Sequence, residues 1–218
     1  MTNSTQKLSR ENKLFPQALE QLYDPPQSIF IQGQAKTLER KLIAIVGNRN
    51  PSRQGIENAI THSTQLVENG YCIISGMACG INASAHQAAI KTGLLYSTIT
   101  VCASGFLHAY PSQYSNLFES IQKVGLLISE YEPNQEAQAL FVYQRNRLIA
   151  SLASAVLVVE ASLSSCSLAV AKCDADLGKD IYAIPGPSTD VRYKGCHYLI
   201  KHGAKLVESY EDISEEFP

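Results

Sequence analysis

Short apolar runs separated by longer amphipathic segments set the pattern of the chain from Leu42 onward. The apolar runs are LIAIVG (42–47), YCIIS (71–75), YSTITVCA (96–103), LLIS (126–129), AVLVVEA (155–161), DIYAIP (180–185) and AKLVE (204–208). Helix-forming patterns lie between them, at 52–70, 81–93, 112–125, 145–152, 167–178 and 197–203. Strands that are apolar throughout and alternate with helices indicate a mostly parallel sheet with helices on both faces. We therefore predict an α/β fold, a doubly wound, extended Rossmann-like domain of about six or seven strands.

The first 40 residues precede this pattern. We expect a polar tail over 1–13, a short helix in FPQALEQLYDPP (15–26) and a short strand at SIFIQG (28–33). This divides the chain into an N-terminal extension, residues 1–40, and a Rossmann-like domain, residues 41–218.

Charge and cysteine usage narrow the class of protein. The formal net charge is −2 and the pI is about 6.2. Proteins that coat nucleic acid without specificity are usually more basic, so any anion binding must come from a local patch. The six cysteines show no CxxC or Cys/His metal spacing, and the N-terminus has no apolar signal core. We expect a cytoplasmic protein with reduced thiols and no bound metal.

The residues that follow each predicted strand are the best placed to bind a ligand, because doubly wound sheets bind ligands beyond the carboxyl ends of their strands. Glycines and hydroxyl groups follow five of these strands, and the next helix offers unpaired N–H groups to an anion. The turn GNRNPSRQG is neither a GxGxxG nor a P-loop motif. Solvated arginines and ordinary helix caps are the alternatives. The phosphate-binding residues predicted in these loops are Gly47, Arg49, Ser52, Arg53, Ser75, Gly76, Ser165 and Ser167.

The segment FVYQRNRLIA places two arginines beside an apolar stretch. Arginine is rarely buried without a partner, so Arg145 and Arg147 either pair with carboxylates or hold an anion. Glu130 and Glu160 both end predicted strands, and we expect them to be the counter-charges. We predict that Arg147 pairs with Glu130 or Glu160, while Arg145 and one aromatic residue face the ligand.

Residues suited to catalysis are scarce in the sequence. The two glutamates could form an acid/base pair, but we see no Ser/His/Asp set, nucleophile elbow or metal cluster. We therefore expect no enzyme activity and no cofactor.

The motifs taken in order resemble those of the DprA/Smf DNA-processing family. The resemblance covers about residues 42–207. It rests on IAIVGNRNPSRQG, IISGMACGINASAH, AYPSQYSNLFESI, LLISEY, RNRLIASLASAVLVVEA, SCSLAVA, IYAIPG and GCHYLIKHGAKLV. The chain differs from the family pattern at Cys79, where an arginine is usual, at Asn82, where an aspartate is usual, and at Cys166, where a glycine is usual.

The resemblance implies a protein that binds single-stranded DNA in a basic pocket, dimerises and helps to load a RecA-type recombinase during natural transformation. Arginine forks bind phosphate and aromatic rings stack on bases, which fits this function. The DNA-binding residues predicted in addition to those in the loops are Phe141, Tyr143, Arg145, Asn146, Arg147, Lys172 and Lys194. Two other functions stay open. One is a nucleotide-binding protein like the nucleoside-monophosphate phosphoribohydrolases, although their PGGxGTxxE signature is missing. The other is a scaffold that has lost DNA binding.

Overall fold

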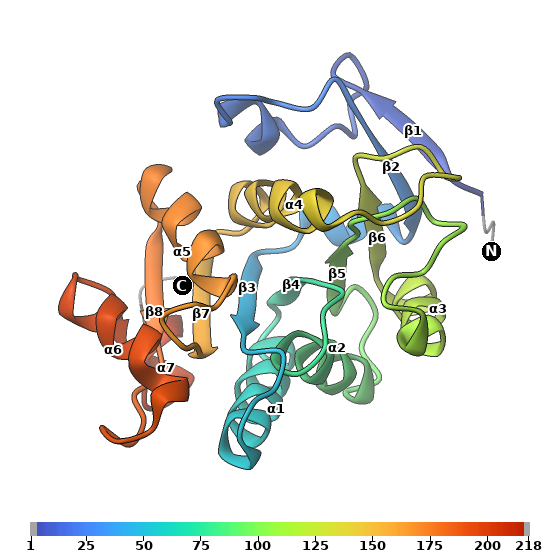
Figure 1. The fold of residues 1–218 in the computed structure, drawn as a ribbon. Helices are drawn as coiled ribbons and strands as arrows, with labels where there is room; N and C mark the ends of the chain where they lie inside the picture. The colour runs from blue at the N-terminus through green and yellow to red at the C-terminus, as the bar shows by residue number, and fades with distance from the viewer. Residues whose placement is uncertain (1–3, 216–218) are drawn as a thin grey trace.

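The computed structural model describes residues 4–215, which form one mixed sheet with helices on both faces (Figure 1). The strands within this range are β1 (Gln6–Ser9), β2 (Ser28–Gly33), β3 (Leu42–Gly47), β4 (Cys72–Gly76), β5 (Thr98–Val101), β6 (Leu126–Ser129), β7 (Ala155–Glu160), β8 (Asp180–Ala183) and β9 (Lys205–Leu206). The α-helices are α1 (Arg53–Glu68), α2 (Ile81–Lys91), α3 (Ser115–Val124), α4 (Ala139–Leu152), α5 (Ser167–Asp176), α6 (Lys194–Lys201) and α7 (Glu211–Ser214). Four short 3-10 helices are η1 (Gln17–Gln21), η2 (Ala35–Glu39), η3 (Ser112–Tyr114) and η4 (Val191–Tyr193).

The sheet has the strand order β1-β2-β6-β5-β4-β3-β7-β8-β9. The strands from β6 to β9 in this order are parallel, and β2 and β1 extend the β6 edge by antiparallel pairing. The chain runs outward from β3 to β6 and then returns to place β7 on the other side of β3. The switch in strand order therefore lies between β3 and β7, where this fold class forms its ligand crevice. The predicted doubly wound, mostly parallel fold is confirmed.

Alternation along the strands builds a core on each face of the sheet. Ile43 and Ile45 point to the face covered by α1 and α2, while Ala44 and Val46 point to the face covered by α4 and α5. All four side chains are almost completely buried. Because both faces are covered, the strands are apolar throughout and show no polar side.

Three expectations differ from the structure. Residues 6–9 of the expected polar tail form β1, whose only buried side chain is Leu8, while residues 1–3 lie outside the described range. Backbone pairing to β2 holds this edge strand, and an apolar pattern cannot reveal it. The helix expected from residue 145 begins at Ala139, and α7 was not expected. The division into residues 1–40 and 41–218 stays a prediction.

Candidate functional site

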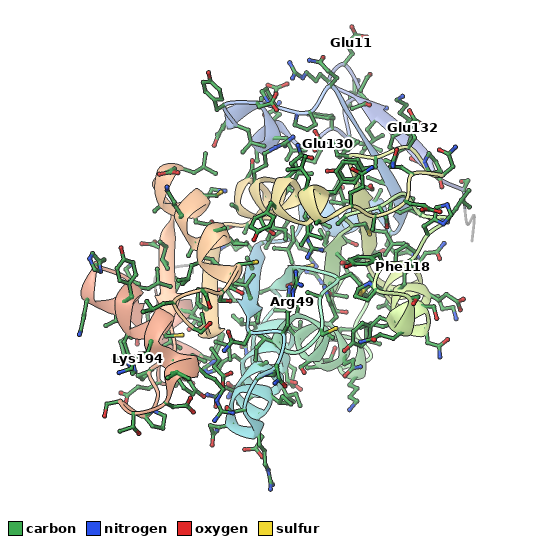
Figure 2. All side chains as sticks on the ribbon, in the orientation of Figure 1. Glu11, Arg49, Phe118, Glu130, Glu132 and Lys194 are labelled. Atoms are coloured by element: carbon green, nitrogen blue, oxygen red, sulfur yellow. The ribbon has the colours of Figure 1, made fainter. Side chains whose placement is uncertain are left out.

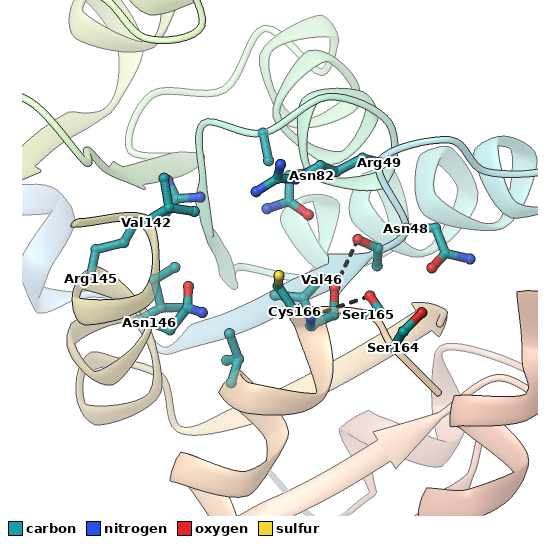
Figure 3. Close-up of a pocket in the computed structure, with 15 residues that line it drawn as sticks. Val46, Asn48, Arg49, Asn82, Val142, Arg145, Asn146, Ser164, Ser165 and Cys166 are labelled. Carbon is teal, nitrogen blue, oxygen red and sulfur yellow. Dashed lines mark hydrogen bonds between the residues drawn. The ribbon is translucent and has the colours of Figure 1, made fainter. Parts of the chain in front are cut away.

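A pocket of about 240 Å³ opens at the switch point, beyond the carboxyl ends of the parallel strands (Figure 3). Its walls come from the end of β3 and the following turn, the start of α2, one face of α4 and the loop that enters α5. None of its described lining residues is acidic. They are Val46, Gly47, Asn48, Arg49, Ala78, Asn82, Val142, Arg145, Asn146, Ile149, Ser164, Ser165, Cys166, Ser167 and Val170.

Arg145 lies in the wall of this pocket and is only 5% exposed. Its Nη1 donates a hydrogen bond to the carbonyl oxygen of Val101 (2.9 Å), and its Nε has no partner among the described residues. Burial is the main cause that lowers the pKa of Arg145 to about 10, so the guanidinium still carries its charge at neutral pH. No carboxylate pairs with it in the described part of the chain. The pocket therefore contains an uncompensated buried positive charge.

Gly76 makes room for that guanidinium. A Cβ atom at this position would lie 2.2 Å from Cζ of Arg145. Gly76, a predicted phosphate-binding residue, does not line the pocket, and its missing side chain leaves the space that Arg145 occupies. Ser75 is buried and its Oγ donates to the carbonyl oxygen of Ile45 (2.6 Å), so it does not reach the pocket.

Arg49 is the second arginine of the pocket. It is exposed, and its guanidinium makes no hydrogen bond or ion pair with any described residue. Figure 3 shows its side chain reaching over the pocket from the turn after β3. Arg49 is close enough to Arg145 for its charge to lower the pKa of Arg145 further. Two like charges near one cavity favour an anionic ligand.

Two asparagine amides add hydrogen-bonding capacity to the pocket wall. Asn146 is 6% exposed and makes no side-chain hydrogen bond within the described range. Asn82 donates through Nδ2 to the carbonyl oxygen of Gly76 (3.2 Å), while its Oδ1 is buried without a described partner. Buried polar atoms are normally paired, so these amides can take hydrogen bonds from a ligand. Asn82 was noted in the sequence only as a departure from the family pattern.

The loop before α5 closes the pocket on a third side. Ser167 donates through Oγ to the carbonyl oxygen of Gly47 (2.8 Å) and thereby ties α5 to β3. The Ser165 hydroxyl accepts from the Ser167 amide (3.3 Å). Cys166 lines the pocket with its thiol 3.5 Å from the Tyr143 hydroxyl. The two serines are therefore engaged in holding the wall of the pocket together.

Arg147 and Glu130 form the ion pair that the sequence predicted. Nη2 of Arg147 lies 2.7 Å from Oε1 and 2.9 Å from Oε2 of Glu130, and each side chain is about one-fifth exposed. Arg147 does not line the pocket. Arg145 is the more buried of the two arginines and lines the pocket, and its contact with a ligand stays a prediction.

Glu160 is not a counter-charge to either arginine, which corrects the sequence-based expectation. Its carboxylate is completely buried and accepts hydrogen bonds from the Asn48 amide, the Ser52 backbone N–H and the Ser52 hydroxyl. Ser52 also accepts from the Gly55 N–H (2.9 Å) and so caps α1. Ser52 is thus a structural residue beside the pocket.

The two aromatic residues of FVYQRNRLIA differ in availability. Phe141 stacks on Tyr131, with ring centroids 4.0 Å apart and planes at 21°. Tyr143 is 58% exposed at the edge of the pocket. Of these two rings, Tyr143 has the face free for stacking.

Three predicted cations do not join the site. Arg53 is exposed and pairs with Glu57 one helical turn away (2.8 Å). Lys172 lines a different groove between α5 and α6. Lys194 is the first residue of α6, donates to the carbonyl oxygen of Ser188 and lies apart from Arg49 (Figure 2).

The described residues offer neither a metal site nor a membrane-spanning helix. They include no group of three or more His, Cys, Asp or Glu that could hold a metal ion. No helix among residues 4–215 is both long and apolar enough to cross a bilayer.

The chain is similar in sequence and in structure to proteins of known family. Residues 6–218 match the family described as DNA recombination-mediator protein A. The DNA processing protein DprA of Streptococcus pneumoniae is 37% identical over 203 residues, which are 93% of this chain and 71% of that protein. A crystal structure of Streptococcus pneumoniae DprA superposes with a TM-score of 0.93 at 36% identity, covering 99% of this chain and 75% of that one. Helicobacter pylori DprA, whose structure concerns its single-stranded DNA binding mode, gives a TM-score of 0.87 at 27% identity, covering 99% and 97%. The chain belongs to the DNA recombination-mediator protein A family, the DprA/Smf family that its motifs resemble.

Proposed function

We propose that this protein binds single-stranded DNA and that the pocket at the switch point holds part of the strand. The observation that carries the proposal is the charge of the pocket: Arg145 and Arg49 line it, neither has a carboxylate partner among the described residues, and no acidic residue lines it. The phosphates of DNA supply the missing negative charge. The DNA binding of the Helicobacter pylori relative, which has the same fold, supports this assignment.

The wider function proposed for the protein follows from its family. It protects DNA in recombination and natural transformation, acts in the cytoplasm as a homodimer and helps to load a RecA-type recombinase. We propose no catalytic step, because the described pocket brings together arginines, amides and hydroxyl groups without a general base.

Fluorescence anisotropy with a labelled oligo-dT tests the proposal. We expect saturable binding at low salt and a loss of roughly 10-fold or more for Arg49→Ala, because a charge-assisted hydrogen bond is removed. Arg53→Ala is the matched control, since Arg53 lies in the same segment but faces solvent and pairs with Glu57. The absence of binding by the wild-type protein at low salt would refute the proposal. Release of adenine from AMP would instead indicate a phosphoribohydrolase-like enzyme.

A further inference from the structure

Glu160 is a buried carboxylate that interacts electrostatically with Arg192 without forming an ion pair among the described residues. It is the last residue of β7, is 0% exposed and takes part in no described ion pair. A buried charge of this kind is costly unless hydrogen bonds replace its hydration. It also does not line the pocket, so a direct role in holding DNA is not its function.

Most hydrogen bonds of Glu160 go to one turn, and the Tyr193 side chain of η4 adds another. Oε1 accepts from Nδ2 of Asn48 (3.0 Å), and both carboxylate oxygens lie 3.1 Å from the backbone N of Ser52. The Ser52 hydroxyl donates to Oε2. The main-chain oxygen of Glu160 accepts from the Asn48 N–H as well (2.7 Å). One residue therefore holds both ends of the segment 48–52.

Arg49 lies between these two anchored ends. Asn48 is fixed further, because its Oδ1 accepts from the Ser162 N–H (3.1 Å) and its Nδ2 donates to the carbonyl oxygen of Arg192 (3.2 Å). The Arg49 side chain itself has no described partner, so the path of the backbone decides where its guanidinium can reach. Holding that backbone before the ligand arrives reduces the ordering that binding must impose.

The Asn48 and Ser52 groups that contact the carboxylate all donate hydrogen bonds to it. Oxygen atoms on both branches of the side chain are therefore needed, and the amide of a glutamine would direct N–H groups at the N–H and O–H groups of the turn. The first turn of α1 also packs against Oε2, since a Cβ atom on Gly55 would lie 2.6 Å from it. A larger or shifted side chain has no space to compensate.

We propose that Glu160 is the positioning residue of the DNA site: its carboxylate fixes the Asn48–Ser52 turn and thereby holds Arg49 over the pocket. The inference rests on the proposed binding of single-stranded DNA. Glu160 acts through Arg49 and does not contact the strand itself.

The test is a double-mutant cycle in the full chain, with oligo-dT affinity measured at low salt and thermal unfolding measured alongside. Glu160→Gln should weaken binding about three- to tenfold, the cost of ordering one long side chain and its turn. In an Arg49→Ala background the same substitution should have no further effect on affinity. Glu130→Gln is the matched control, since it breaks a largely buried pair outside the pocket and should leave affinity unchanged.

Two results would overturn the inference: wild-type affinity of folded Glu160→Gln, or equal losses from Glu160→Gln with and without Arg49. Purely structural damage would give that second, additive result. Should Glu160→Gln fail to fold, Ser52→Ala replaces it, with an expected loss of about two- to fivefold that also disappears in Arg49→Ala. Failure of the proposed function is distinguishable, because the wild-type protein would then not bind oligo-dT.

Discussion

Replacing each arginine of α4 by methionine separates a ligand-binding charge from a structural one. Arg145 and Arg147 are two residues apart on one helix and are both largely buried. Arg145 lines the pocket without a carboxylate partner in the described chain, while Arg147 pairs with Glu130 away from the pocket. We predict that Arg145→Met abolishes most DNA binding at little cost in stability, and that Arg147→Met does the reverse.

The magnitude for Arg145→Met follows from two opposing terms. Burial lowers the pKa of Arg145 from 12.5 to about 10, and this corresponds to about 3 kcal/mol of penalty on the charged form. The hydrogen bond to Val101 returns about 1.5–3 kcal/mol of that penalty. Replacement by methionine removes both the penalty and the hydrogen bond, so the free energy of unfolding should change by about 1.5 kcal/mol or less. Affinity for oligo-dT should fall by roughly 30-fold or more, because a desolvated charge is lost from the pocket.

Arg147→Met leaves Glu130 largely buried without its cation. We expect a loss of about 2 kcal/mol in unfolding free energy, or roughly 4–8 °C in Tm, and DNA affinity within about threefold of wild type. Thermal unfolding and anisotropy on the same preparations measure both quantities. The reasoning is refuted if Arg145→Met is the less stable variant, or if Arg147→Met loses as much affinity as Arg145→Met.

Three further predictions concern stability. Asp174 is buried with both carboxylate oxygens unpaired among the described residues, and burial raises its pKa to about 7. The unfolded state loses this proton near pH 4 and the folded state only near pH 7, so the carboxyl group costs stability progressively as pH rises over this range. Asp174→Asn should therefore stabilise by about 1–3 kcal/mol at pH 8 and by nothing at pH 4 in urea unfolding. Equal gains at the two pH values would contradict this prediction. Burial lowers the pKa of His86 to about 3, so stability should fall as pH drops from about 6.5 toward 3, and His86→Gln should flatten that slope. If His86→Gln lost as much stability as the wild-type protein between about pH 6.5 and 3, this prediction would be wrong. Gly47→Ala places a Cβ 2.5 Å from Ile81 Cγ1 and 2.9 Å from the Glu160 carbonyl oxygen, and should cost about 1–3 kcal/mol in denaturant unfolding; a neutral effect would show that the strand can shift.

Much of the fold follows from the apolar runs and their glycine-capped helices, because burial on both faces leaves a pattern that few other folds produce. Strand β1 does not follow from such a pattern, since only Leu8 of its four residues is buried. Backbone pairing to β2 holds this strand in the sheet. The position of the pocket also follows from the sequence, because parallel strands bring their carboxyl ends to one edge.

The roles of the two arginines depend on the side of α4 that each one occupies. Sequence spacing does show that they lie on different sides of α4, and Arg145 is in helical register with Val142, Ile149 and Leu152, all buried. That register was the available signal that Arg145, and not Arg147, faces the sheet. For Glu160 no such signal exists, because its partners Asn48 and Ser52 are more than 100 residues away in the chain.

The salt dependence of binding tests the central claim most directly. If Arg49 contacts a phosphate at the pocket, the slope of log K against log salt should become less steep by about 0.7 in Arg49→Ala, and Arg53→Ala should keep the wild-type slope. Equal slopes for the wild-type protein and Arg49→Ala would contradict the assignment of this pocket as the DNA site.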